Sequence, residues 1–246
     1  MKESLYSRNA VYETLRAKRR QVFSLEIAEG VQEKGRISDI LRMAAERKIQ
    51  VRRVPCAKLD KVHANHQGVV AEVNGYSYAD IADIFDLAET RKEPLFVMLL
   101  DSLNDPQNFG ALLRTAEAVS VHGVVIPLAR TVEVTPAVVN ASSGASEHLL
   151  IARSNLAQAM DALKEAGAWI IGLDQKGQTL EASRNAPLQG ALGLVVGSEG
   201  EGLHELTRKK CDILLKLPMR GQIESLNAAV AGSVVLYLAY LARNND

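Results

Sequence analysis

Residues 217–242 read LPMRGQIESLNAAVAGSVVLYLAYLA and join the end of a strand, a polar loop and an apolar helix. The apolar run that ends at Pro218 predicts a buried strand, and the small and apolar residues that follow the loop predict a helix over 225–243. Ser225 is a candidate N-cap, which would leave helix N–H groups nearby, and Asn227 adds a side-chain amide. A helix built for burial therefore opens onto a polar site.

The chain before this stretch alternates apolar strands with helices. LFVMLLD (Leu95–Asp101) is a continuous apolar run, which is typical of a strand buried on both faces. We predict strands at Leu95–Asp101, Gly123–Pro127, His148–Ala152, Ala168–Asp174, Ala191–Gly197 and Ile213–Pro218, with helices at 108–120, 135–142, 154–166 and 203–210. This alternation indicates a parallel sheet with helices on both faces, an α/β fold.

The first 75 residues form a separate α/β pattern. They predict helices at Tyr6–Lys18, Ile37–Arg47 and Pro55–Val62, and strands at Gln21–Ala28, Gln50–Arg53 and Gly68–Val73. Asn74-Gly75 marks a turn, and the acidic stretch Tyr76–Glu93 predicts a helical linker that ends before Pro94. We therefore predict a small domain at 1–75, a linker at 76–94 and a second domain at 95–246.

Charge is distributed unevenly along the 246 residues, although the formal net charge is zero. Residues 1–75 contain 15 Lys and Arg against 9 Asp and Glu, a net charge of +6, so the remainder carries −6. A basic end is expected for a protein that contacts phosphate backbones, while a chance imbalance on a solvated surface is the alternative.

Several classes of protein are disfavoured by composition. No uninterrupted run of about 20 apolar residues predicts a membrane span, and no apolar core follows the N-terminus as in a secretory signal. Cys56 and Cys211 lie far apart and outside any CxxC, which indicates reduced thiols in a cytoplasmic protein. Only His63 and His66 lie close together among the histidines, which is too few ligands for us to predict a metal site.

Polar residues collect in three places that follow predicted strands, where parallel α/β sheets bind ligands. The first is DSLNDPQNFGALLRTAEA, in which Asn108 can cap a helix and Arg114 lies within it. An ordinary cap and a surface arginine are the alternative there. The second is GSEGEGL (Gly197–Leu203), which lacks the ending of a phosphate loop and the G-x-G-x-x-G spacing of a dinucleotide site. The third is the polar loop before the last helix, and together the three predict one pocket.

These motifs resemble a known family. DPQNFGALLRTAEA, GSEGEGL and LPMRGQIESLNAAVA are similar to the three motifs of the SpoU/TrmH RNA ribose 2′-O-methyltransferases, in the same order, over Leu95 to about Ala242. HQGVVAEV (His66–Val73) resembles the small domain of the bacterial 23S rRNA guanosine-2′-O-methyltransferases, which has an L30e-like fold. One departure is Ala228-Ala229-Val230, where family members often carry Val-Ser-Val.

The resemblance implies a SPOUT-type catalytic domain whose last helix threads a deep trefoil knot, an exception to ordinary topology. It implies that S-adenosylmethionine binds in the knot, held largely by backbone groups of Gly197, Leu217 and Leu226, with Gly172 lining the same pocket. It also implies a homodimer that packs through the catalytic domains and an RNA substrate, rRNA in the first place.

The resemblance also implies a set of catalytic residues. Arg114 is expected to bind a phosphate or the developing 2′-alkoxide, because a guanidinium rarely gives up its proton. Asn108 would orient Arg114 or the ribose, and Glu199 would order the loop or bind Arg114. Ser225 and Asn227 would contact the target nucleotide or the loop backbone.

The same residues are also compatible with functions other than rRNA ribose methylation. Within the family they are a tRNA ribose methyltransferase and a thiostrepton-resistance type of rRNA methyltransferase. A non-catalytic RNA-binding protein with the same fold is an alternative of another class, but Asn108, Arg114 and Glu199 are all present. A dinucleotide-dependent oxidoreductase is disfavoured by the glycine spacing.

Overall fold

The computed structural model describes residues 2–179, 188–198, 200–223 and 225–244. By its internal contacts the chain divides into two units. The first unit comprises Met1–Ser77 and Glu133–His148, and the second comprises Tyr78–Val132 and Leu149–Asp246.

The first unit contains a four-stranded sheet with the order β1-β4-β2-β3. Its strands are β1 (Lys2–Tyr6), β2 (Val22–Ala28), β3 (Gln50–Val54) and β4 (Val69–Asn74), and its helices are α1 (Arg8–Ala17), α2 (Arg36–Glu46), α3 (Cys56–Asp60), α6 (Pro136–Ala141) and the short 3₁₀ helix η1 (Ala145–Glu147). β4 runs antiparallel to both β1 and β2, whereas β2 and β3 are parallel. The sequence pattern did not predict β1, which precedes the helix expected from Tyr6 onward.

The segment Glu133–His148, which joins β6 to β7 of the second sheet, belongs to the first unit through its contacts. A buried arginine links the two parts of that unit. Arg20 Nε donates to Glu147 Oε2 at 3.0 Å and Arg20 Nη1 donates to Glu3 Oε2 at 2.6 Å, while the guanidinium lies over the ring of Tyr76. Burial raises the pKa of Glu147, and the charge of Arg20 opposes that shift. The ion pair therefore fixes the segment to the first unit at a desolvation cost.

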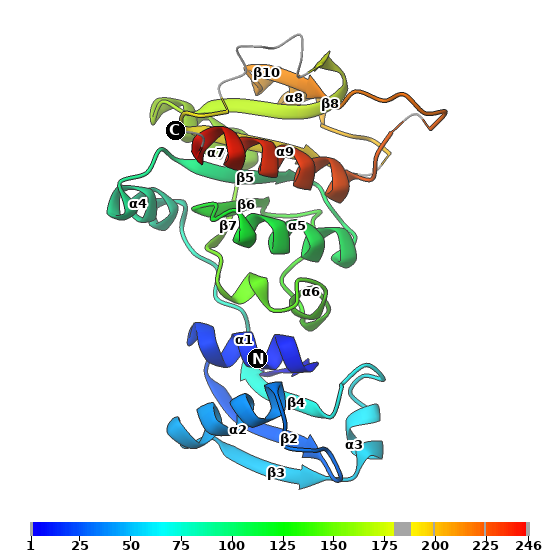
Figure 1. Ribbon diagram of the computed structural model, residues 1–246. Coiled ribbons are helices and arrows are strands. Elements are labelled where there is room, and N and C mark those ends of the chain that lie inside the picture. The colour runs from blue at the N-terminus through cyan, green and yellow to red at the C-terminus, as the bar shows by residue number, and fades with distance from the viewer. Residues whose placement is uncertain (1, 180–187, 199, 224, 245–246) are drawn as a thin grey trace. The chain divides into compact units, whose positions relative to one another are not determined.

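The second unit contains a six-stranded parallel sheet with the order β10-β8-β9-β5-β6-β7 (Figure 1). Its strands are β5 (Phe96–Asp101), β6 (Gly123–Pro127), β7 (Ile151–Ser154), β8 (Trp169–Thr179), β9 (Leu192–Gly197) and β10 (Ile213–Lys216). Its helices are α4 (Ile81–Arg91), α5 (Pro106–Ala118), α7 (Leu156–Glu165), α8 (Glu205–Lys210) and α9 (Ala228–Asn244). The predicted α/β fold with a parallel sheet is confirmed.

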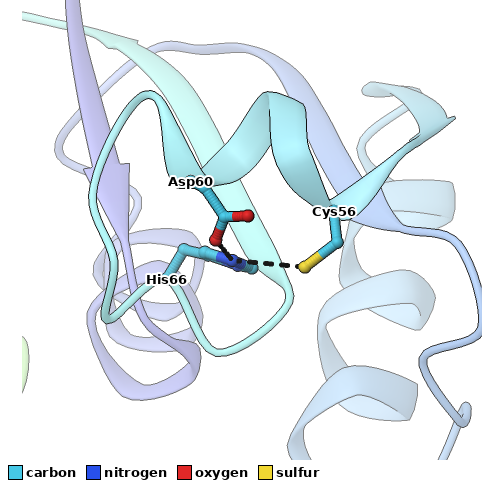
Figure 2. Close-up of side chains that lie close together, drawn as sticks. All are labelled: Cys56, Asp60 and His66. Carbon is cyan, nitrogen blue, oxygen red and sulfur yellow. Dashed lines mark hydrogen bonds and ion pairs between the residues drawn. The ribbon is translucent and has the colours of Figure 1, made fainter.

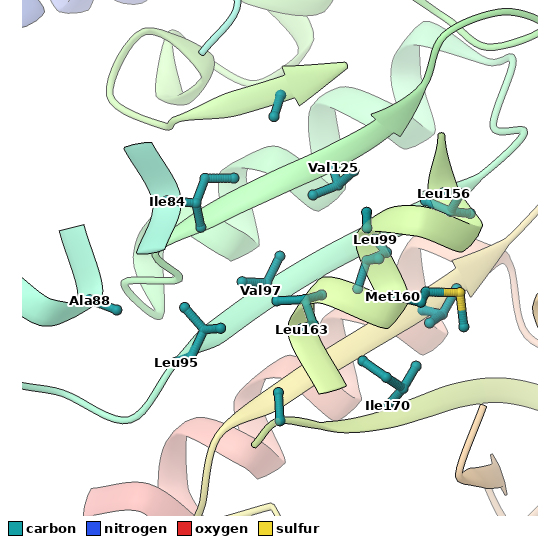
Figure 3. Packing of buried hydrophobic residues seen from close by; sticks show 14 of the residues in the cluster. Ile84, Ala88, Leu95, Val97, Leu99, Val125, Leu156, Met160, Leu163 and Ile170 are labelled. Atoms are coloured by element: carbon teal, nitrogen blue, oxygen red, sulfur yellow. The ribbon is translucent and has the colours of Figure 1, made fainter. Parts of the chain in front are cut away.

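Helices cover both faces of this sheet. Alternate residues of the central strands, including Val97, Leu99 and Val195, pack with α4 and α7 in one apolar cluster (Figure 3). On the other face, a Cβ added to Gly232 of α9 would lie 2.6 Å from Leu112 of α5 and 3.0 Å from Val196 of β9. The central strands are therefore buried on both sides, as their unbroken apolar sequence predicts. Helix α4, which falls in the expected linker, contributes Ile84 and Ala88 to this core.

The last helix begins later than predicted. Helix α9 spans Ala228–Asn244 rather than starting at position 225. Ser233 on α9 lies 2.9 Å, oxygen to oxygen, from the hydroxyl of Thr115 on α5, which fixes the register of the two helices. Within the part of the chain that the structure describes, no helix is both long and apolar enough to cross a bilayer.

Candidate functional site

A cavity of about 1110 Å³ lies where β8, β9 and β10 end at their carboxyl edges. Its walls come from the last part of β8, the loop after β9, the loop after β10 and the beginning of α9. Gly197, Leu217, Ser225, Leu226 and Asn227, all predicted as site residues, are among the lining residues. The volume suits a small-molecule ligand of cofactor size.

The loop after β9 is a tight turn that requires glycine. Ser198 and Gly202 exchange two backbone hydrogen bonds of 3.1 Å. Gly200 and Gly202 have φ values of +87° and +69°, which side chains other than glycine rarely adopt. A Cβ on Gly197 would lie 2.4 Å from the carbonyl oxygen of Gly202. The glycines thus let the loop fold back on itself and leave its backbone at the cavity wall.

A buried carboxylate anchors the far end of this loop. Asp101, at the end of β5, accepts a hydrogen bond of 2.8 Å from His204 N, and its second oxygen lies 2.9 Å from His204 Nδ1. Asp101 is only 4% exposed. The pair was not predicted from the sequence, although an acid at the end of a wholly apolar strand is a signal that indicates it.

Asn227 is the residue that caps α9. Its Oδ1 accepts from the backbone N–H groups of Ala229 at 2.9 Å and Val230 at 3.1 Å. Ser225, predicted as the cap, instead lies two residues before it at the cavity wall. Asn227 is the cap because it lies directly before the first helical residue, so its side chain reaches the second and third helical N–H groups.

Asn108 also has a different local role from the one predicted. Helix α5 begins at Pro106, and its cap is Asp105, which accepts from Asn108 N at 2.8 Å. The side chain of Asn108 is therefore not used as a cap, and its Oδ1 accepts a 3.0 Å hydrogen bond from Asn227 Nδ2. Two of the predicted site residues, 119 positions apart in the sequence, are in direct contact at the mouth of α9.

The other predicted site residues are Arg114, Gly172 and Glu199. Arg114 is exposed on α5, and neither Arg114 nor Gly172 is among the described residues that line the cavity. A Cβ on Gly172 would lie 2.6 Å from Cys211 Sγ and 2.8 Å from Leu203 Cδ1. A side chain at this position would therefore point toward apolar neighbours. Glu199 lies outside the described residues. The roles expected for these three residues stay predictions.

Charged residues border the cavity next to β8. Arg208 Nε donates to Asp174 Oδ2 at 2.7 Å, and Asp174 Oδ1 accepts from Lys176 N at 2.8 Å. Burial raises the pKa of Asp174, but these hydrogen bonds and the neighbouring positive charges outweigh it, so its pKa lies below the ordinary value. Lys216 adds another cation to the lining. This side of the cavity therefore carries an Arg208–Asp174 ion pair together with the further cation of Lys216.

The first unit contains a second cluster of chemically versatile side chains, shown in Figure 2. His66 Nε2 lies 3.1 Å from Asp60 Oδ1 and 3.6 Å from Cys56 Sγ. His66 Nδ1 accepts from Gly68 N at 2.8 Å, so in the neutral ring Nε2 carries the proton and donates it to Asp60. A metal ion would need the Nε2 lone pair, and this tautomer does not offer it. This cluster was not predicted from the sequence, because Cys56 and Asp60 approach His66 only once the chain folds.

The chain is similar to known proteins in both sequence and structure. The profile of the SpoU rRNA Methylase family matches residues 95–237, and the profile described as RNA 2′-O ribose methyltransferase substrate binding matches residues 5–79. A Bacillus subtilis relative, YacO, which is assigned to the TrmH family of tRNA/rRNA methyltransferases, is 44% identical over 96% of this chain and 94% of its own length.

Solved structures share the fold. The SpoU methyltransferase AviRb from Streptomyces viridochromogenes, in complex with AdoMet, matches with a TM-score of 0.81 and 23% identity, over 100% of this chain and 92% of its own. An AdoMet-bound rRNA methyltransferase from Sinorhizobium meliloti gives 0.78 and 20%, over 100% and 88% of the two chains. The family profile and the Bacillus subtilis relative define the class of protein as RNA methyltransferases. The chain belongs to the SpoU/TrmH family of RNA methyltransferases.

Proposed function

We propose that this protein transfers a methyl group from S-adenosylmethionine to a ribose 2′-hydroxyl of RNA, with a guanosine of 23S rRNA as the target. The observation that carries the proposal is the cavity, whose wall combines the loops after β9 and β10 with the mouth of α9. The Asn108–Asn227 hydrogen bond at that mouth brings α5, the helix of Arg114, to the same place.

The cavity residues fit S-adenosylmethionine. Its volume of about 1110 Å³ is ample for the cofactor. The glycine turn at Gly197 exposes backbone groups, and Gly197, Leu217 and Leu226 would hold the cofactor mainly through them. Lys216 offers positive charge to a carboxylate, whereas the charge of Arg208 is balanced by Asp174. When bound, this cofactor supplies an electrophilic methyl group and leaves as a neutral thioether.

The chain would contribute orientation and electrostatics. Asn227, fixed by its capping bonds, and Asn108, fixed through Asn227, would position the ribose, and Ser225 would contact the nucleotide or the loop. Holding the 2′-oxygen in line with the methyl carbon, about 3 Å away, lowers the activation free energy by several kcal/mol. Arg114 would bind the adjacent phosphate or the alkoxide as negative charge develops. Glu199 would order the loop that carries it.

A threaded C-terminus follows from the same proposal. Strand β10 lies at the edge of the sheet, yet α9 packs on β9 and α5 near its centre. We propose that the chain is threaded here as the deep trefoil knot that the resemblance to the family implies. We also propose that the first unit adopts an L30e-like fold that binds the RNA.

We propose that the homodimer forms through an exposed apolar face of α9. Val230, Val234, Tyr237 and Leu241 are 49%, 39%, 48% and 51% exposed. They recur at helical spacing on the face opposite Gly232, which packs on the core. An apolar stripe of this kind on a soluble protein favours a partner, and a second copy of this chain is the occupant that we propose.

A 23S rRNA target is favoured over tRNA by the extent of the structural matches. A solved structure that concerns the 2-OH methylation of C/U34 on tRNA covers only 62% of this chain. Its TM-score is 0.54 and its sequence identity is 26%. The rRNA methyltransferase from Sinorhizobium meliloti matches the first unit as well as the second. An enzyme with a basic additional unit suits a large structured RNA. We propose that it acts in the cytoplasm.

The proposal is tested with the purified protein, tritiated S-adenosylmethionine, and separate transcripts of 23S rRNA and tRNA. We expect tritium in a 2′-O-methylguanosine of the rRNA alone, and loss of the same modification from cells that lack the gene. Methylation of tRNA alone would favour the alternative within the family. Binding of RNA without methyl transfer to either transcript would favour the non-catalytic alternative.

A further inference from the structure

The first unit has a rigid polar surface at one end of β1 and β4 that the methyl-transfer site does not use. It is formed by Arg8, His63 and Gln67, hereafter the Arg8–His63–Gln67 surface, and all three side chains are exposed. Arg8 follows β1, whereas His63 and Gln67 belong to the loop that precedes β4. Because β1 and β4 pair directly, with Tyr6 opposite Val70, these residues meet at the same edge.

Two exposed side chains of this surface are joined to each other. Arg8 Nε donates to the carbonyl oxygen of Gln67 at 3.0 Å, and Arg8 N donates to Gln67 Oε1 at 3.1 Å. Among the described residues, no carboxylate lies within ion-pair distance of Arg8. The guanidinium is therefore held in place with its positive charge open to an external anion.

His63 offers a flat ring with one face covered. It stacks on Tyr6 with ring centroids 4.0 Å apart and an angle of 8° between the planes. Its Nδ1 accepts a 3.0 Å hydrogen bond from Asn65 N, which fixes the ring's rotation. Tyr6 is buried and covers the inner face, so the outer face of an exposed, immobilised ring remains for a ligand.

The backbone beneath the surface is strained. Ser7 has φ 79° and ψ 149°, a region that residues other than glycine rarely adopt, and Gln67 has φ 54°. A conformation such as that of Ser7 is unfavourable by itself and persists only where the surrounding structure holds it in place. The hydrogen bond between His66 and Asp60 stabilises the loop (Figure 2). His66 Nδ1 also accepts a hydrogen bond from Gly68 N. The fold thus tolerates an unfavourable backbone conformation while it holds these three exposed side chains in one arrangement.

We propose that the Arg8–His63–Gln67 surface binds an unpaired nucleotide of the substrate RNA. The base stacks on the outer face of His63, a phosphate contacts Arg8, and the amide of Gln67 donates to the base edge. Single-stranded RNA is recognised by stacking on flat side chains together with arginine contacts to phosphate. The net charge of +6 on residues 1–75 complements such a ligand. This inference rests on the proposed function and assigns its substrate contacts in the first unit.

The test uses the full-length protein and a fluorescent single-stranded RNA oligonucleotide, with binding followed by anisotropy. His63→Ala should weaken binding by about 5- to 100-fold, the range that one stacked base contributes. His63→Phe keeps a flat ring and should restore most of the affinity. Arg8→Leu should weaken binding and lower the slope of log Kd against log salt by about 0.7, which corresponds to one lost phosphate contact.

The matched control is Arg42→Leu, which removes the same charge from an exposed position on α2 of the same unit. It should leave the salt slope unchanged. Thermal melting confirms folding of each variant, and His63→Phe keeps the test valid if Arg8→Leu unfolds. Wild-type affinity in folded His63→Ala, or the same loss in Arg42→Leu as in Arg8→Leu, would overturn the inference. Retained S-adenosylmethionine binding and methyl transfer by the wild type separate that outcome from failure of the proposed function.

Discussion

Asn227 combines a structural role as a helix cap with a proposed role in catalysis. Its oxygen caps α9 and its nitrogen donates to Asn108. Asn227→Ala should lower the free energy of unfolding by about 1 kcal/mol through loss of the cap, and it should lower kcat as well. Asn227→Asp keeps the capping oxygen but cannot donate to Asn108. Denaturant unfolding should therefore show near wild-type stability for Asn227→Asp, while methyl-transfer assays should still show a loss. Equal activity in the wild type and Asn227→Asp would remove the Asn108 contact from the mechanism.

His122 makes the stability of the second unit depend on pH. It is 1% exposed, its Nδ1 accepts from Phe96 N at 2.9 Å, and its Nε2 lies 3.0 Å from Glu93 Oε2. Burial lowers the pKa of His122 below 6.5, although Glu93 opposes the shift. The folded state therefore binds fewer protons than the unfolded state, so the stabilisation is full above pH 6.5 and is lost as the pH falls through the folded pKa.

This pH dependence is measured against His122→Gln, whose side chain can accept from Phe96 N and donate to Glu93 but does not titrate. Denaturant unfolding between about pH 7.5 and pH 5 should show a steeper loss of stability in the wild type than in His122→Gln. Parallel curves for the two proteins would show that His122 does not titrate differently in the folded and unfolded states.

At the scale of elements, the packing of α9 depends on Gly232. A Cβ there would lie 2.6 Å from Leu112 and 3.0 Å from Val196, and a valine adds further atoms at a close crossing of α9 with α5 and β9. Gly232→Val should lower the free energy of unfolding by about 1–3 kcal/mol through overpacking. Gly190→Ala is the control, because a Cβ at that position meets nothing within 4 Å. A Tm for Gly232→Val equal to that of the control would contradict this account.

The elements also show which parts of the fold the sequence could predict. The unbroken apolar runs of β5 and β9 are typical of strands buried on both faces. The parallel sheet could be predicted from these runs together with the helices between them. The loops after the strands could be located for the same reason. The caps could not be assigned, because Asp105 and Asn108, like Ser225 and Asn227, are competing capping residues within one turn, and tertiary contacts decide between them. Strand β1 was missed because only its pairing with β4 defines it.

At the scale of the molecule, the exposed stripe on α9 predicts self-association. Val234→Glu should place a charge in the centre of the proposed interface and convert a dimer into a monomer in sedimentation velocity experiments. The control is Leu206→Glu on α8, where an apolar side chain is 61% exposed but lies outside the stripe. A monomeric wild type, or a Val234→Glu protein that sediments as the wild type does, would exclude the stripe as the dimer interface.

The division into two units leads to a prediction about their separate roles. The proposed cofactor cavity is lined entirely by residues of the second unit, whereas the proposed RNA surface belongs to the first. Deletion of residues 1–75 should therefore spare S-adenosylmethionine binding and abolish RNA methylation. The deletion must also replace Val138 and Val139 by threonine, because both are fully buried on α6, which packs on β1, and would become exposed. Calorimetry and methyl-transfer assays check the two outcomes. Normal methylation by the truncated protein would show that the first unit does not select the RNA, and loss of cofactor binding in a folded protein would show that the cavity depends on it.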